Sequence, residues 1–210
     1  MRTLPGIVHI VDDDEAICDA LSWLFNSRGL IASTYLSAEE FLERFQPDPQ
    51  HGPHCLLLDV RMSGMSGLGL QEQLLATGCS IPILFLTGHG DVPMAVNALK
   101  RGAVDFLQKP FNDNELVDRV IDSLDKEANR IVQMATQASI SLRLALLTPR
   151  ERDVLNRMVI GKYNKVIADE LGVCVRTVEV HRSRILEKMG VKTAVELAHL
   201  MAGPHASNVA

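Results

Sequence analysis

Residues 55–59 read CLLLD, a short apolar run that ends in a single aspartate. Such a run fits a strand buried in a sheet, and four comparable runs lie with it in the first 124 residues. Amphipathic stretches separate these runs, an alternation typical of parallel strands covered by helices on both faces. We therefore expect an α/β domain with a five-stranded, doubly wound parallel sheet. The expected strands are residues 7–11, 30–35, 55–59, 83–87 and 104–107.

The ends of the intervening helices are marked as well. Ser37 and Glu40 have the spacing of a capping box, and Asp14 stands where the first helix should begin. Gly29, Gly78 and Gly102 are placed where helices should end, because glycine readily adopts the left-handed conformation that closes a last helical turn.

The composition favours two domains without membrane spans. The chain has 210 residues, 47% of them apolar, which suffices for one or two ordinary cores. It has no apolar run long enough to cross a bilayer, and its start, MRTLPG, lacks the basic and apolar regions of a signal peptide, so we expect a cytoplasmic protein. Cysteines 18, 55, 79 and 174 form no CxxC pair, and we expect them to be small core residues.

Charge is unequally divided along the chain. Residues 1–124 contain 8 Lys and Arg against 17 Asp and Glu, whereas residues 125–210 contain 13 against 9. An acidic module is therefore joined to a mildly basic one. Binding to phosphates requires a basic surface, although ordinary variation between surfaces also explains the difference.

Charged and hydroxyl side chains follow the ends of four expected strands. In chain order they are Asp12, Asp13, Asp14, Asp59, Thr87 and Lys109. In open parallel sheets, ligands bind outside the carboxyl ends of the strands. Clustered carboxylates repel one another and need a hard divalent cation, and few protein ligands plus waters suit Mg²⁺. Lys109 and Thr87 would complete a cradle for a phosphoryl group, which an aspartate can accept covalently. Any one of these residues could instead be a helix cap or a solvated loop end, as we expect of Asp14.

From Val117 onward, apolar residues recur in alternating steps of four and three, the heptad spacing of a coiled coil. They are Val117, Ile121, Leu124, Ala128, Ile131, Ala135, Ala138 and Leu142. The last helix of the first domain is therefore expected to continue as a linker over residues 125–145 and to pair with a second copy of the chain. A merely amphipathic helix that frays near its small residues explains the pattern equally well.

Beyond Leu147 the sequence pattern is helical throughout. Thr148, Pro149 and Glu151 combine an N-cap, a proline at the first helical position and a capping-box glutamate. We expect this helix to reach about residue 160, with further helices at 165–171, 176–189 and about 193–201, before a frayed tail, GPHASNVA. The turn GVCV at 172–175 is typical of a helix-turn-helix.

Four motifs resemble the receiver domain of bacterial response regulators. They are VDDD at 11–14, LLLDVRMSGMSG at 56–67, ILFLTGHGDVPMAV at 83–96 and GAVDFLQKPF at 102–111, and GHGDVPMAV is similar to the NarL/FixJ group in particular. The resemblance implies a flavodoxin-like receiver over residues 1–124, in which a sensor histidine kinase transfers a phosphoryl group to Asp59. It also implies that Asp13, Asp59 and the backbone carbonyl of Arg61 bind Mg²⁺, with Asp12 acting through water.

The same resemblance assigns roles to the other residues of the receiver pocket. Lys109 would pair with the phosphoryl oxygens and have a cis bond to Pro110, while Thr87 and Phe106 would form the switch that reports phosphorylation. Phe106 is equally well explained as a core residue. Ser63 stands where such receivers usually have proline, and we expect a looser loop there without the loss of a ligand.

Three motifs near the C-terminus resemble the LuxR-type DNA-binding domain. They are LTPRERDVL at 147–155, NKVIADELGV at 164–173 and RTVEVHRSRILEKMGV at 176–191. The resemblance covers about residues 145–202 and implies a DNA-binding domain over 146–210. Cys174 replaces the serine that often caps the recognition helix in this family, so we expect a weaker cap.

Helical spacing divides the expected recognition helix into two faces. Val178, Ile185, Leu186 and Met189 should face the core, and the outer surface that enters the major groove should present Arg176, Glu179, Val180, Arg182, Ser183 and Arg184. By resemblance, the residues that read bases are Glu179, Val180 and Ser183. The candidates for phosphate contacts are Lys165, Arg176, Thr177, Arg182, Arg184 and Lys188, although Lys188 is also explained as a solvated charge near a helix end.

These features predict a phosphorylation-gated regulator of transcription that is not an enzyme, and the family resemblance favours activation over repression. The expected partners are a sensor histidine kinase, double-stranded DNA with paired promoter half-sites, RNA polymerase and a second copy of the chain. One alternative is an aspartyl-phosphate phosphatase, which is disfavoured because Arg61 occupies the place of the second aspartate found in haloacid-dehalogenase-type phosphatases. Another is a receiver that only dimerises, which the complete pocket disfavours.

Overall fold

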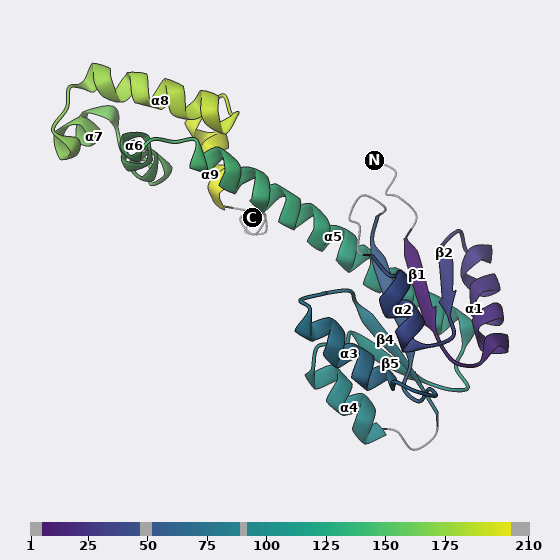
Figure 1. Ribbon diagram of the computed structural model, residues 1–210. Coiled ribbons are helices and arrows are strands. Elements are labelled where there is room, and N and C mark those ends of the chain that lie inside the picture. Colours follow the sequence, from purple (N-terminus) through teal and green to yellow (C-terminus); the bar gives the residue numbers. More distant parts are fainter. Residues whose placement is uncertain (1–5, 47–51, 89–91, 203–210) are drawn as a thin grey trace. The chain divides into compact units, whose positions relative to one another are not determined.

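A computed structural model describes residues 6–46, 52–88 and 92–202 of the chain (Figure 1). Contacts divide the chain into two units, Met1–Ile131 and Val132–Ala210, which we describe separately. Residues 89–91 of the motif GHGDVPMAV and the tail GPHASNVA lie outside the described residues.

The first unit is a parallel five-stranded sheet in the order β2-β1-β3-β4-β5 with helices on both faces. Its strands are β1 Ile7–Val11, β2 Ile31–Tyr35, β3 His54–Asp59, β4 Ile83–Thr87 and β5 Asp105–Gln108. Its helices are α1 Glu15–Ser27, α2 Ala38–Arg44, α3 Gly67–Ala76, α4 Val92–Lys100 and the first part of α5 Asp113–Ala145. The strand order and the parallel pairing confirm the expected fold class, and each strand begins and ends within one residue of its prediction.

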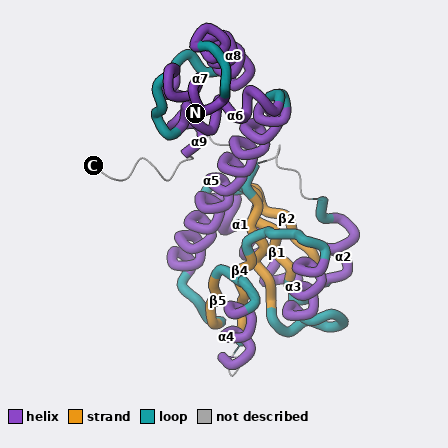
Figure 2. Tube along the Cα trace, turned by 90° about the vertical axis from the view of Figure 1, so that its left-hand side faces the viewer, coloured by secondary structure: helices purple, strands orange, loops and turns teal. Residues whose placement is uncertain are grey.

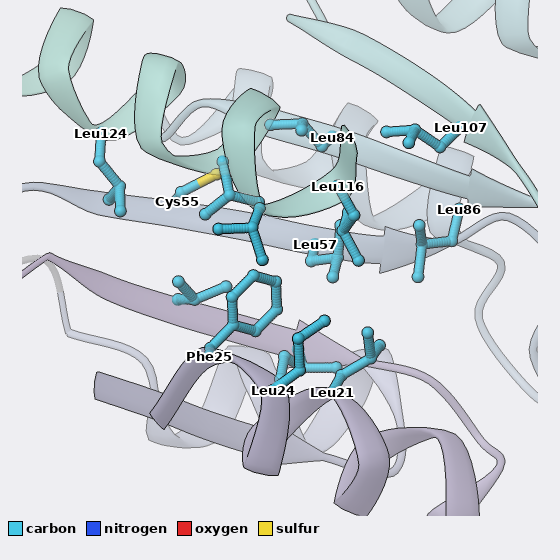
Figure 3. Packing of buried hydrophobic residues seen from close by; sticks show 14 of the residues in the cluster. Leu21, Leu24, Phe25, Cys55, Leu57, Leu84, Leu86, Leu107, Leu116 and Leu124 are labelled. Atoms are coloured by element: carbon cyan, nitrogen blue, oxygen red, sulfur yellow. The ribbon is translucent and has the colours of Figure 1, made fainter. Parts of the chain in front are cut away.

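Two buried apolar clusters hold these helices on the sheet. Helices α1 and α5 cover one face, where Figure 3 shows Leu24 and Phe25 of α1 and Leu116 and Leu124 of α5 around Leu57 of β3. A second cluster, with members from α2, α3 and α4, covers the other face, and Figure 2 shows α2 and α3 across the sheet from α5. The strands are therefore covered on both sides, and the three central strands β1, β3 and β4 are buried almost throughout.

The predicted helix signals act nearly as expected. Asp14 caps α1 by accepting hydrogen bonds from the amides of Ala16 and Ile17. Ser37 Oγ accepts from the Glu40 amide, but the Glu40 carboxylate accepts from the Leu36 amide instead of closing the expected box. Glycines 29, 78 and 102 have φ values of +80°, +74° and +96°, the left-handed conformation expected where a helix ends.

Helix α5 is continuous from Asp113 to Ala145 and passes from one unit into the next. Its first turns belong to the sheet core, since Val117 and Leu124 are buried there. Ala135, Ala138 and Leu142, further along, are exposed. The expected heptad seam is thus divided, and its buried residues cannot pair with a second copy.

The second unit is a helical bundle. Its helices are α6 Pro149–Val159, α7 Asn164–Leu171, α8 Val175–Met189 and α9 Ala194–Ala202. They enclose one buried cluster that includes Val154, Ile167, Val178, Ile185 and Leu197. The helices begin and end within one residue of the predictions, and the expected capping box at the start of α6 is present.

The turn between α7 and α8 confirms the expected helix-turn-helix. Gly172 adopts a left-handed conformation with φ of +64°, and its amide bonds back to α7. Of the core residues expected on α8, Val178, Ile185 and Met189 are buried, whereas Leu186 is only half-buried at the edge of the cluster. No helix in the described part of either unit is both long and apolar enough to cross a bilayer.

Candidate functional site

One lysine joins two aspartates at the carboxyl end of the sheet. Lys109 Nζ lies 2.6 Å from Asp12 Oδ2 and 2.6 Å from Asp59 Oδ1. Asp59 ends β3 and Asp12 follows the adjacent strand β1, so the parallel register brings their side chains to the same edge. The two aspartate side chains are only 3% and 9% exposed. The ammonium therefore neutralises buried charges that would otherwise repel each other.

The pKa values of Asp59 and Lys109 are shifted because two carboxylates, those of Asp12 and Asp59, share the Lys109 ammonium. Burial raises the pKa of Asp59, and the neighbouring Asp12 adds to this effect, while the hydrogen bond from Lys109 opposes it. Burial alone would lower the pKa of Lys109, but its hydrogen bonds to Asp12 and Asp59 outweigh that effect and raise the pKa. The lysine is therefore held in its charged form.

Asp13 is turned to a different partner. Its Oδ2 accepts hydrogen bonds from the Ser63 amide and from the Ser63 hydroxyl, each 2.8 Å long. These bonds lower the pKa of Asp13. The loop also donates from the Met65 amide to Glu39 Oε1 at 3.0 Å. The expected loosening of the loop is therefore wrong, because serine keeps the amide hydrogen that proline lacks and adds a hydroxyl donor.

The side chains expected to bind Mg²⁺ have suitable chemistry, since hard cations prefer oxygen ligands. Asp12, Asp13 and Asp59 all belong to this edge of the sheet, and the Arg61 amide donates to Asp59 Oδ2 at 2.7 Å. The three carboxylates are not gathered around one point, however. In the described residues, no three His, Cys, Asp or Glu side chains are close enough together to hold a metal ion. Asp12 and Asp59 converge on Lys109, while Asp13 bonds to Ser63.

The two expected switch residues lie on neighbouring strands. Thr87 ends β4 and is buried, and its carbonyl accepts from the Lys109 amide at 2.7 Å. Phe106 pairs with Phe85 in the β4–β5 register and packs, half-buried, against the second apolar cluster. The bond between Lys109 and Pro110 is cis, as the resemblance implied. Thr87 thus lies beside the acidic residues, and Phe106 lies on the face covered by α3 and α4.

In the second unit, α8 presents a polar outer face. The side chain of Arg176 is 85% exposed and lies 3.5 Å from Glu179. Most of the residues expected to contact DNA are exposed, whereas Thr177 and Arg182 are half-buried. The exposed ones are Lys165, Arg176, Glu179, Val180, Ser183 and Arg184. Exposure of Val180 on an otherwise polar face is notable, since an apolar side chain there can contact a thymine methyl group.

Lys188 has an internal partner. Its Nζ lies 2.7 Å from Glu151 Oε2 and donates to the Leu146 carbonyl at 3.1 Å. The Glu151 side chain is only 3% exposed, and the Lys188 ammonium, followed by the Thr148 amide, lowers its pKa to about 2. Lys188 thus holds α8 against the start of α6, a structural role that stands beside its proposed phosphate contact.

The prediction that all four cysteines are core residues is wrong for Cys174. It is exposed rather than part of the core, and Cys79 is only half-buried, whereas Cys18 and Cys55 are buried as predicted. As the N-cap residue of α8, Cys174 makes no side-chain hydrogen bond to the helix backbone, and its sulfur lies 3.1 Å from Thr177 Oγ1. The weaker cap is therefore confirmed.

Both halves of the chain match known protein families. Residues 8–121 match the response regulator receiver domain, and residues 145–201 match the bacterial regulatory proteins of the luxR family. The chain is 45% identical over 195 residues to the C4-dicarboxylate transport transcriptional regulatory protein DctR of Rhodobacter capsulatus, covering 92% of this chain and 98% of DctR. It is 42% identical over 198 residues to the transcriptional regulatory protein FixJ of Azorhizobium caulinodans, covering 93% and 92% of the two chains. The chain belongs to the NarL/FixJ family of response regulators.

Solved structures of other response regulators have the same architecture. The regulator StyR is 42% identical with a TM-score of 0.84, over 94% of this chain and 98% of StyR. Full-length FixJ from B. japonicum is 38% identical with a TM-score of 0.60, over 95% and 97% of the two chains. This response regulator is therefore a DNA-binding component of a two-component system, and its family regulates transcription. Receivers of response regulators typically bind Mg²⁺ where they are phosphorylated.

Sequence reasoning missed two contacts at the acidic edge of the sheet. One is the bond of Ser63 to Asp13, which joins residues 50 positions apart. The other is the close approach of Gly67, at the start of α3, to Asp59, where an added Cβ would lie 2.1 Å from the Asp59 carbonyl oxygen. Only glycine allows α3 to approach the backbone of Asp59 this closely.

Proposed function

We propose that Asp59 accepts a phosphoryl group from a sensor histidine kinase in the presence of Mg²⁺. The observation that supports this most directly is the contact of Lys109 with two buried carboxylates at the ends of adjacent strands. Asp13, Asp59 and the Arg61 carbonyl would bind the metal, and Asp12 would act through water. Bound Mg²⁺ would supply positive charge that offsets the charge of the transferring phosphoryl group.

The protein's own residues have distinct roles in this transfer. A carboxylate oxygen of Asp59 forms a bond to phosphorus as the bond from phosphorus to the kinase histidine nitrogen breaks. The Lys109 ammonium, which already contacts Asp59, pairs with the phosphoryl oxygens. The Thr87 hydroxyl, at the neighbouring strand end, donates to the same group. Movement of Thr87, accompanied by Phe106, is the proposed switch.

Phosphorylation would promote homodimerisation and thereby paired DNA contacts. We propose the face formed by α4, β5 and α5 as the surface that changes, and the linker of residues 125–145 as a second contact between copies. Of the proposed seam, Ala135, Ala138 and Leu142 are exposed in the second unit. We keep the receiver at residues 1–124 and the DNA-binding domain at 146–210 as proposed boundaries.

In the DNA-binding domain, α8 would enter the major groove of each half-site. Glu179, Val180 and Ser183 would read base edges. The residues proposed to contact phosphates are Lys165, Arg176, Thr177, Arg182, Arg184 and Lys188. Sequence-specific binding next to RNA polymerase in the cytoplasm would then control transcription, and we propose activation rather than repression.

The test measures DNA affinity and oligomeric state with and without a small-molecule phosphodonor and Mg²⁺. Duplexes would first be selected from a random library by the phosphodonor-treated protein. Fluorescence anisotropy and analytical ultracentrifugation then compare wild type, Asp59→Asn and the control Asp14→Asn, which changes the helix cap of the same acidic run. We expect tighter binding and dimerisation upon treatment in wild type and Asp14→Asn only. If the phosphodonor does not change DNA affinity in wild type, the proposed control of DNA binding by phosphorylation is wrong and the receiver only dimerises.

The linker contact has its own test. Ala128→Asp and Leu142→Asp place a charge on the proposed seam, so both variants should shift the treated protein toward monomer in ultracentrifugation. Ser141→Asp, a charge added at the neighbouring exposed position, serves as the control. Unchanged association in both seam variants would remove the linker from the dimer interface.

A further inference from the structure

The loop between β3 and α3 binds one carboxylate of the acidic edge. Ser63 donates twice to a single oxygen, Asp13 Oδ2, once from its amide and once from its hydroxyl. Asp12 and Asp59 are instead bonded to Lys109. The three carboxylates of the proposed metal site are thus divided between a lysine and a serine.

The serine end of this contact is itself anchored. The Met65 amide, two residues beyond Ser63, donates to Glu39 Oε1 at 3.0 Å. At the other end of the loop, the Gly67 amide donates to the Val60 carbonyl at 3.1 Å. The loop is therefore held to α2, and its two ends are joined to each other, so both contacts oppose its movement with Asp13.

We propose that Ser63 is a positioning residue that competes with Mg²⁺ for Asp13 and thereby lowers the Mg²⁺ affinity of the receiver. The inference rests on the proposed role of Asp13 as a metal ligand. Mg²⁺ demands near-ideal octahedral geometry, and the three carboxylates do not meet around one point in the described residues. Ser63 occupies Asp13 Oδ2 with two hydrogen bonds, so Mg²⁺ can use this oxygen only when at least one of these bonds breaks or lengthens.

Proline and alanine separate the two donors of Ser63. Ser63→Pro removes the hydroxyl and the amide hydrogen, whereas Ser63→Ala removes the hydroxyl alone. A net hydrogen bond to a charged group changes an equilibrium by about tenfold when shielded and by less when exposed, and Asp13 is exposed. We therefore expect the dissociation constant for Mg²⁺ to fall by about fivefold in Ser63→Pro and by about twofold in Ser63→Ala.

A titration of the full chain with MgCl₂, followed by amide chemical shifts in ¹⁵N NMR spectra, measures this affinity without phosphorylation. Ser66→Ala is the matched control, because Ser66 lies in the same loop but its hydroxyl caps α3 through the Gly69 amide. Its affinity should equal that of wild type. If Ser63→Pro does not fold, Ser63→Ala alone decides the outcome.

Two failures can be told apart in this titration. If Mg²⁺ moves no amide signal near Asp12, Asp13 or Asp59 in wild type, the proposed metal site is wrong. If wild type binds Mg²⁺ but the Ser63 variants bind it equally or more weakly, the site stands and the competition is refuted. A weaker affinity in both variants would mean that Ser63 prepares Asp13 for the metal.

Discussion

Replacing Gly67 with alanine places a methyl group against the backbone of the proposed phosphoacceptor. The added Cβ would lie 2.1 Å from the Asp59 carbonyl oxygen and 3.1 Å from Leu58 Cγ, whereas real Cβ atoms essentially never approach within 3.0 Å of another heavy atom. Helix α3 and β3 must therefore move apart by about 1 Å, and overpacking of this kind costs about 1–3 kcal/mol. Alanine's better helix propensity returns up to about 1 kcal/mol. We expect a net loss of about 1–2 kcal/mol of receiver stability.

Urea unfolding followed by the amide signals of the sheet strands in ¹⁵N NMR spectra measures this loss, because those strands belong to the receiver alone. Gly69→Ala is the matched control two residues away, because its Cβ would meet the flexible side chains of Met65 and Ser66 at 3.2 and 3.5 Å. It should be neutral or stabilising by up to about 1 kcal/mol. A Gly67→Ala protein as stable as Gly69→Ala would refute the close approach of α3 to Asp59.

Three further predictions concern other contacts. Lys188→Met should destabilise the DNA-binding domain by about 2 kcal/mol, because it leaves the buried Glu151 without its cation, and thermal unfolding measures this. The control Lys165→Met should keep the wild-type stability and lose only DNA affinity. Burial, assisted by the neighbouring His54, lowers the pKa of His9 to about 4 from 6.5. Below pH 6.5 the unfolded chain binds a proton at His9 that the folded chain does not bind, so receiver stability should fall by up to about 3 kcal/mol between pH 6.5 and 4. Urea unfolding followed by the same strand amide signals at several pH values measures this, and a stability that is flat across the range contradicts it. Arg184→Ala should weaken DNA binding and reduce its salt dependence by about one phosphate contact, which anisotropy at several salt concentrations measures.

The sequence predicted the elements of the fold well because their signals are local. Apolar runs, capping residues and glycines at helix ends lie within a few residues of what they determine, and the strand and helix ends agree within one residue. The meeting of Asp12, Asp59 and Lys109 was also predictable. Parallel strands bring their carboxyl ends to one edge whatever the details of packing.

The choice of partners was not predictable, because it depends on tertiary contacts. Nothing local indicates that Lys188 bonds to Glu151, which is 37 residues away. Heptad spacing likewise does not distinguish a helix that packs on its own sheet from one that pairs with a second helix, and Val117 proved to be a core residue. The apolar neighbours of Cys174 suggested burial, but the residue ends a turn, where side chains reach solvent.

The central claim is that Asp59 is the residue that accepts the phosphoryl group. Intact-protein and peptide mass spectrometry after incubation with a small-molecule phosphodonor and Mg²⁺ tests it most directly. We expect one added phosphoryl group on wild type, located on the peptide that contains Asp59, and none on Asp59→Asn. Equal labelling of wild type and Asp59→Asn would contradict it.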